Sequence, residues 1–139
     1  GAVETVQAIA EAGIPLGVVS SAVYHPFLEW TLSAFGIRDD FVTIVTSASA
    51  GFYKSRPEIY LHAAELLAAQ PERVVHVGDS LRYDVGGASR AGMGTVWLQF
   101  PGKPGDGSQF TPDLTVTTLQ GSAPGILGVL SARLQAQRA

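Results

Sequence analysis

The 139-residue sequence contains no cysteine. This absence excludes disulfide bonds, thiolate metal sites and a cysteine nucleophile, and leaves the redox compartment unspecified, so we expect the default, cytoplasmic location. Charge is also sparse: charged residues make up 15% of the chain, with a net charge of −3. Because Lys and Arg are scattered, neither nucleic acid nor an anionic membrane is an expected partner.

Long hydrophobic runs are absent as well. The first residues lack the basic start and apolar stretch of a signal peptide, and no run reaches the roughly 18 apolar residues of a membrane span. The composition is nevertheless 46% hydrophobic, with a mean hydropathy of +0.21. Such a chain should fold, and its length suits a single domain over residues 1–139.

Short apolar runs alternate with helical patterns along the chain. Predicted strands cover residues 14–22, 41–48, 74–80 and 94–100, with a weak fifth strand at 114–118. Predicted helices cover residues 3–12, 26–35, 57–69, 85–91 and 125–137. In the third of these helices the residues expected to face inward are Ile59, Leu61, Leu66 and Leu67. This order predicts an α/β fold of three layers, in which a Rossmann-like parallel sheet carries helices on both faces.

Polar side chains follow three of the predicted strands, where an open α/β sheet binds its ligands. They are Ser20 and Ser21, then Lys54, then Asp79 and Asp84. Hydroxyl and ammonium groups can hold phosphate oxygens, and carboxylates at a strand end can bind Mg²⁺. The set therefore indicates phosphoryl transfer.

Each of these residues also has a structural explanation. Ser20 and Ser21 suit the cap of the following helix, and Lys54 suits a solvated loop. Asp79 suits a turn, and Asp84 the N-cap of the helix predicted to begin at the next residue. The three histidines show no metal-ligand spacing, and structural roles are expected for His25, His62 and His76.

Three segments together resemble a known family. GVVSSA, GFYKSRPEIY and VVHVGDSLRYDVGGASRAGMGTVWL are similar, in order and spacing, to the second, third and fourth motifs of the haloacid dehalogenase-like hydrolases. The resemblance implies that Ser20, Ser21 and Lys54 bind phosphate, with Ser20 and Lys54 acting in catalysis. It also implies that Asp79 is a Mg²⁺ ligand and that Asp84 supports the metal shell.

The family's first motif has no counterpart in this sequence. That motif is a strand ending in Asp-x-Asp, which supplies the nucleophile and the general acid, and a cap domain usually follows it. Asp39-Asp40 precedes a strand and Asp106 lies in a Gly/Pro-rich loop, so neither fits. A smaller departure is Lys54-Ser55-Arg56-Pro57 in place of the family's usual Lys-Pro-Asp-Pro.

In the resembling fold the absent strand is central, between the strands that end at Ser20 and Gly78. Unpaired backbone groups in a buried slot cost about 1–3 kcal/mol each, so we expect the slot to be filled. An N-terminal segment, a second copy in a homodimer, another chain, or direct pairing of the flanking strands would each fill it.

Two function classes follow. The first is the C-terminal portion of a Mg²⁺-dependent phosphatase for a small phosphorylated metabolite, inactive as this chain alone. The alternative is a non-catalytic phosphate-binding or assembly module. A GDSL-type esterase is disfavoured because no histidine follows His76, and a nicotinamide-binding domain because no G-x-G-x-x-G follows a strand.

Overall fold

The computed structural model describes residues 1–21, 25–51, 56–102 and 109–138. Its helices are α1 (Ala2–Glu11), α2 (His25–Ala34), α3 (Ser47–Ala50), α4 (Pro57–Leu66), α5 (Gly86–Arg90) and α6 (Ala123–Arg138). Its strands are β1 (Gly17–Ser20), β2 (Thr43–Thr46), β3 (Val75–Gly78), β4 (Gly94–Leu98) and β5 (Leu114–Val116). Among the described helices, none is long and apolar enough to cross a bilayer.

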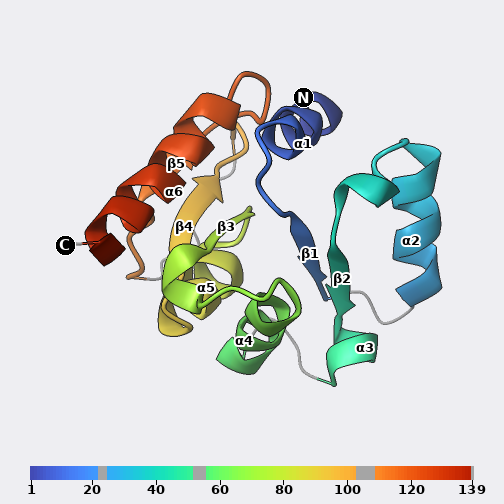
Figure 1. The fold of residues 1–139 in the computed structure, drawn as a ribbon, viewed down its shortest axis with the longest axis horizontal. Coiled ribbons are helices and arrows are strands. Elements are labelled where there is room, and N and C mark those ends of the chain that lie inside the picture. Colours follow the sequence, from blue (N-terminus) through green and yellow to red (C-terminus); the bar gives the residue numbers. More distant parts are fainter. Residues whose placement is uncertain (22–24, 52–55, 103–108, 139) are drawn as a thin grey trace.

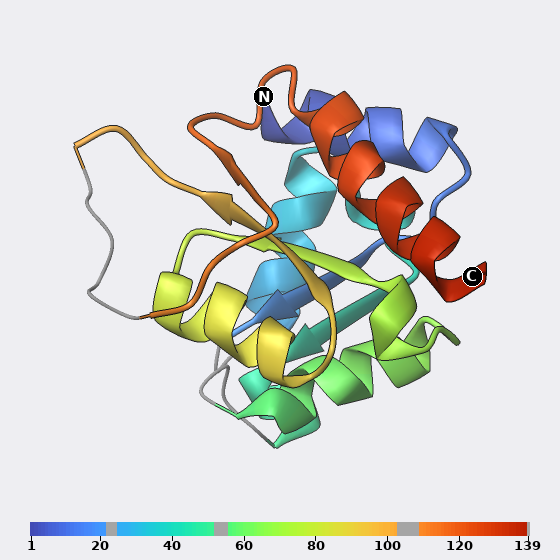
Figure 2. The same cartoon turned by 90° about the vertical axis from the view of Figure 1, so that its left-hand side faces the viewer.

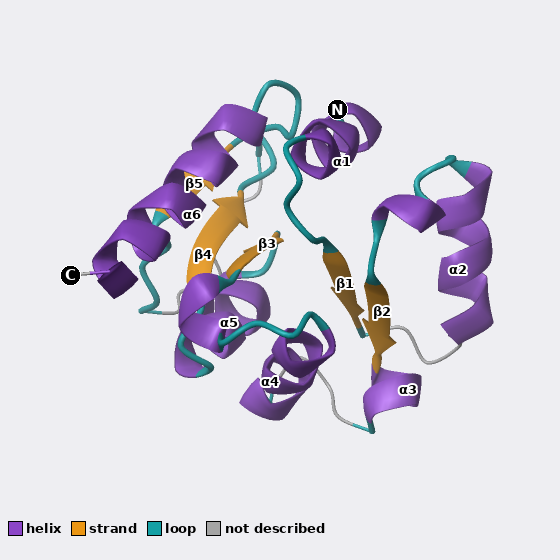
Figure 3. Ribbon diagram, viewed as in Figure 1, coloured by secondary structure: helices purple, strands orange, loops and turns teal. Residues whose placement is uncertain are grey.

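The strands form two parallel sheets. One sheet pairs β1 with β2, and the other has the order β3-β4-β5. Helices α1 and α6 lie together on one side of the strands, and α4 and α5 lie together on the other (Figures 1 and 3). The predicted α/β architecture is therefore confirmed, although the described strands fall into two sheets rather than one.

Two apolar clusters hold these layers together. The first joins β2 to α4 and α5 through residues such as Val45, Ile59 and Ala88, all at most 1% exposed. The second joins α1, β4 and α6 through Ile9, Val96 and Ile126. The β1-β2 sheet is thus buried against α4 and α5, and the β3-β4-β5 sheet is buried against α1 and α6.

Helix faces differ in part from the sequence prediction. The predicted inward residues Leu61 and Leu66 of α4 are 43% and 46% exposed, whereas Tyr60 and Ala64 are buried beside Ile59. Side chains three and four positions apart share a helix face, so burial of Ile59, Tyr60 and Ala63 turns Leu61 outward.

The predicted strand 41–48 extends two residues beyond β2 at each end, and the two at its C-terminal end belong to α3. Thr46 ends β2 and caps α3: its Oγ1 accepts a hydrogen bond from the Ser49 N–H at 3.1 Å, while Ser49 Oγ accepts one from the Thr46 N–H at 2.9 Å. This reciprocal capping box stops the strand and starts a helix at Ser47.

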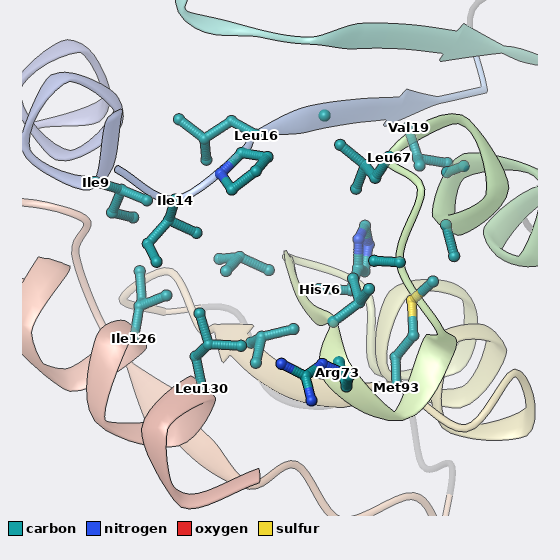
Figure 4. Close-up of a pocket in the computed structure, with 18 of the residues that line it drawn as sticks. Ile9, Ile14, Leu16, Val19, Leu67, Arg73, His76, Met93, Ile126 and Leu130 are labelled. Carbon is teal, nitrogen blue, oxygen red and sulfur yellow. The ribbon is translucent and has the colours of Figure 1, made fainter. Parts of the chain in front are cut away.

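An apolar cavity separates the two sheets. No strand pairing joins β1 to β3 in the described part of the chain, and a cavity of about 280 Å³ lies between them. Side chains of α1, β1, α4, β3 and α6 line it, and most are aliphatic (Figure 4). We call this cavity the strand slot. Direct pairing of the flanking strands, one of the four sequence-based alternatives, is thus not seen.

We expect the isolated chain to self-associate through the strand slot, because an apolar cavity between unpaired strand edges favours contact with another copy. Light scattering across a dilution series should show a dimer that dissociates on dilution. Leu130→Lys, which places a charge in the slot, should shift the protein to monomer. Leu61→Lys makes the same change on the exposed face of α4 and should leave association intact.

A monodisperse monomer at every concentration, with a melting temperature independent of concentration, would contradict this expectation.

Candidate active site

The carboxyl ends of β1, β2 and β3 lie on the same side of the molecule. Figure 2 shows the three strands running in the same general direction, from right to left. Ser20 is the last residue of β1, Thr46 the last of β2, and Asp79 directly follows β3. The structure therefore brings together two of the predicted site regions, on either side of the strand slot.

The remaining predicted site residues differ in how far the structure describes them. Ser21 follows β1 and is exposed. Lys54 lies outside the described residues, as does the loop that carries it. Its predicted contact with phosphate stays a prediction.

The end of β2 contains a hydrogen-bonded group that the sequence analysis did not identify. His25 Nδ1 lies 3.0 Å from the fully buried Thr46 Oγ1, and His25 Nε2 lies 3.6 Å from a Glu29 carboxylate oxygen. Arg38 donates from two nitrogens to the other Glu29 oxygen, at 2.8 and 3.0 Å. These contacts tie α2 to β2 and support the structural role expected for His25.

Asp84 is the most buried carboxylate at this edge, with 2% exposure. Its Oδ2 accepts a hydrogen bond from the Ser80 N–H at 3.0 Å, and its Oδ1 lies 3.0 Å from His76 Nε2. An ionised carboxylate only accepts hydrogen bonds, so Nε2 of His76 is the donor in this pair. The expected structural role of His76 thus has a defined partner.

Asp84 is not the N-cap that one structural explanation suggested. The chain after β3 turns at Leu81–Val85, a π-type turn in which the Val85 N–H donates to the Ser80 carbonyl. Ser80 is the capping residue, since its hydroxyl accepts from the Tyr83 N–H at 3.0 Å. The predicted helix at 85–91 therefore follows a turn that begins four residues earlier, which places Asp84 inside that turn.

Tyr60 covers the same group from α4. Its ring packs edge-on against the His76 ring with 5.0 Å between centroids, and its hydroxyl donates to the Tyr83 carbonyl at 2.8 Å. Burial, and secondarily the negative charge of Asp84, raise the pKa of Tyr60 above its ordinary value. Tyr60 therefore stays a neutral donor that encloses the Asp84–His76 pair.

Asp79 has the opposite environment. Its side chain is exposed at the strand end, while its backbone carbonyl accepts a hydrogen bond from the Trp97 indole N–H at 3.0 Å. The two predicted metal residues thus differ: Asp79 is accessible, and both carboxylate oxygens of Asp84 have protein partners.

These residues fit part of a Mg²⁺ site. Mg²⁺ prefers oxygen ligands and keeps several waters, so an exposed carboxylate at a strand end suits it. However, no group of three or more acidic, histidine or cysteine side chains gathers within the described residues. Further oxygen ligands would have to come from water, substrate or other protein segments.

The fold and these strand ends define an α/β core of the Rossmann-like kind, with polar side chains at the carboxyl ends of its strands. The model of the haloacid dehalogenase-like hydrolases matches residues 1–92, and the chain belongs to this family.

Relatives with assigned names support this membership. The chain is 39% identical over 98 residues to glyceraldehyde 3-phosphate phosphatase of Methanopyrus kandleri, a match that covers 70% of this chain and 41% of that protein. It is 36% identical over 101 residues to haloacid dehalogenase-like hydrolase domain-containing protein 3 of Bos taurus, covering 73% of this chain and 39% of that protein. This chain thus spans about two fifths of the length of either relative.

A solved structure gives the same result. The crystal structure of a haloacid dehalogenase phosphatase from Thermococcus onnurineus superposes with a TM-score of 0.79 at 32% identity. The superposition covers 90% of this chain and 55% of that chain. The arrangement of strands and helices described above is therefore the arrangement of a known phosphatase core.

We expect Gly78→Ala to destabilise the protein by about 2–4 kcal/mol, because a Cβ at this position would overlap the carboxyl group of the buried Asp84. Chemical unfolding at a fixed protein concentration measures the change. Gly128→Ala is the matched control: a Cβ there meets nothing within 4 Å, so α6 should gain about 0.5–1 kcal/mol. Equal stability of the parent and Gly78→Ala would contradict the packing of Asp84 against β3.

Proposed function

We propose that this chain is the C-terminal part of the core of a Mg²⁺-dependent phosphatase that acts on a small phosphorylated metabolite. The observation that carries the proposal is the placement of Ser20 and Asp79 at parallel strand ends on either side of the strand slot. A hydroxyl on one side and a carboxylate on the other suit a phosphoryl group and its metal ion.

Each residue has a distinct role in this proposal. Ser20, with Ser21 beside it, donates hydrogen bonds to the phosphoryl oxygens, and Lys54 neutralises their charge and positions the nucleophile. Asp79 would hold Mg²⁺, which spreads the charge that develops on the transferring group. Asp84, buried behind the strand end, supports the loop that carries Asp79.

The nucleophile belongs to a segment that occupies the strand slot. No Asp-x-Asp sequence occurs in the chain, and Ser20 and Asp79 flank a slot that has an unpaired strand edge on each side among the described residues. A strand that filled the strand slot would end between Ser20 and Asp79, where the nucleophile must lie to attack phosphorus. The isolated chain would therefore lack the attacking group. The strand that carries this group would belong either to the same polypeptide or to a separate one.

The substrate class is supported by the named relatives. Four glyceraldehyde 3-phosphate phosphatases and a phosphatase for a phosphoribitylamino-uracil from Escherichia coli match this chain at 29–39% identity. All five names include a small phosphorylated metabolite. We propose the same class for this protein.

The isolated chain should not hydrolyse p-nitrophenyl phosphate above background in the presence of Mg²⁺, because no group is placed to attack phosphorus. Colorimetric measurement of nitrophenol release tests this. Turnover that survives further purification and is lost in Asp79→Asn would overturn the assignment of the nucleophile to another segment.

Inorganic phosphate should still bind weakly to the isolated chain, and Ser20→Ala should weaken that binding about tenfold, the usual contribution of a hydrogen bond to a charged group. Calorimetric or NMR titration with phosphate measures the two affinities. Ser33→Ala makes the same change on the exposed surface of α2 and should have no effect. Equal phosphate affinities of the parent and Ser20→Ala would argue against a phosphate site at the end of β1.

A further inference from the structure

The peptide group between Asp79 and Ser80 is hydrogen-bonded to a side chain at each end. Its carbonyl accepts from the Trp97 indole N–H at 3.0 Å, and its N–H donates to Asp84 Oδ2 at 3.0 Å. A peptide group is planar, so these two bonds fix its orientation, and with it the backbone torsions on either side. The backbone from which the Asp79 side chain projects is therefore held by Trp97, on the neighbouring strand, and by Asp84, four residues beyond Ser80 in the following turn.

His76 and Tyr60 extend this arrangement into the core. His76 Nε2 holds the second oxygen of Asp84 at 3.0 Å, so the carboxylate cannot rotate away from Ser80 without losing that bond. Tyr60, 0% exposed, packs against the His76 ring and limits its movement. His76 and Tyr60 thus hold the Asp84 carboxylate in the position where it accepts the hydrogen bond of the Ser80 N–H.

Trp97 reaches the peptide group from the opposite side through the sheet register. It pairs with Gly78 across β3 and β4, directly beside the residue that precedes Asp79. Gly78 itself has no side chain, and the space next to it is occupied by the Asp84 carboxyl group. The strand end therefore receives one side chain from the neighbouring strand and one from the following turn.

We propose that Trp97 and the Asp84–His76 pair form a clamp on the Asp79–Ser80 peptide group, and that Trp97 and His76 are positioning residues that aim the Asp79 carboxylate at the site. This inference rests on the proposed metal role of Asp79. It assigns a function to Trp97 and His76, which lie outside the predicted site. In this proposal Asp84 acts by holding the backbone N–H of Ser80.

The clamp is tested by amide hydrogen exchange of Ser80, followed by NMR on the full chain. Trp97→Phe keeps an aromatic ring but removes the indole donor, and His76→Leu removes the donor to Asp84 while His76→Gln retains one. We expect Ser80 exchange to accelerate about tenfold or more in Trp97→Phe and His76→Leu, as expected from loss of one hydrogen bond to the clamp. His76→Gln should stay near the parent, and Trp30→Phe, an exposed site on α2, should not differ from it.

The second measurement is the Mn²⁺ affinity, obtained from the water proton relaxation rate during a titration. The Asp79→Ala variant gives the affinity that remains when the site is lost. Trp97→Phe should weaken Mn²⁺ binding several-fold at an unchanged melting temperature, a combination that a purely structural role would not give. Faster Ser80 exchange with unaltered Mn²⁺ affinity would overturn the positioning role.

Unchanged Ser80 exchange in both Trp97→Phe and His76→Leu would overturn the clamp itself. If His76→Leu fails to fold, Trp97→Phe alone decides, because it leaves the buried carboxylate and its histidine intact. Failure of the parent chain to bind Mn²⁺ would count against the proposed metal function, and the exchange rates would still decide whether the clamp exists.

Discussion

Backbone pairing is the constraint on which the rest of this structure depends. Strands inside a parallel sheet must satisfy their N–H and C=O groups on both edges when helices cover both faces. Within the part of the chain that the structure describes, β1 pairs only with β2, and β3 only with β4, so one edge of each faces the apolar strand slot. Helices α1 and α6 on one side and α4 on the other still line that space. The layers thus keep an arrangement similar to that of the solved Thermococcus onnurineus phosphatase, around a position that no described strand occupies.

The same position separates the two halves of the candidate site. Ser20 belongs to one sheet and Asp79 to the other, so their relative placement depends on the helices that bridge the slot rather than on direct strand pairing. Contacts of α4 with β1, β2 and α5 provide one such bridge, and the contact of α1 with α6 provides another. Any contact that fixes the two sheets relative to each other therefore also fixes the Ser20 hydroxyl relative to the Asp79 carboxylate, so occupation of the strand slot would influence the ligand binding proposed between these strand ends.

Asp84 shows how a buried charge can organise a loop. A carboxylate that is 2% exposed requires hydrogen-bond donors, and His76 and the Ser80 N–H provide them. The observed conformation of the turn after β3 places both donors on the carboxylate and so offsets the cost of burying its charge. Gly78 is part of the same arrangement, since no other residue leaves room for that carboxyl group.

The sequence by itself determined the alternation of strands and helices and the family, because apolar periodicity and motif spacing are local properties of the chain. It also placed Ser20 and Asp79 correctly at strand ends. Only the tertiary structure decided which face of α4 is buried, that Asp84 pairs with His76 rather than capping a helix, and that Trp97 contacts the Asp79 carbonyl. Each of these depends on residues brought together by packing and strand register, which no local pattern encodes.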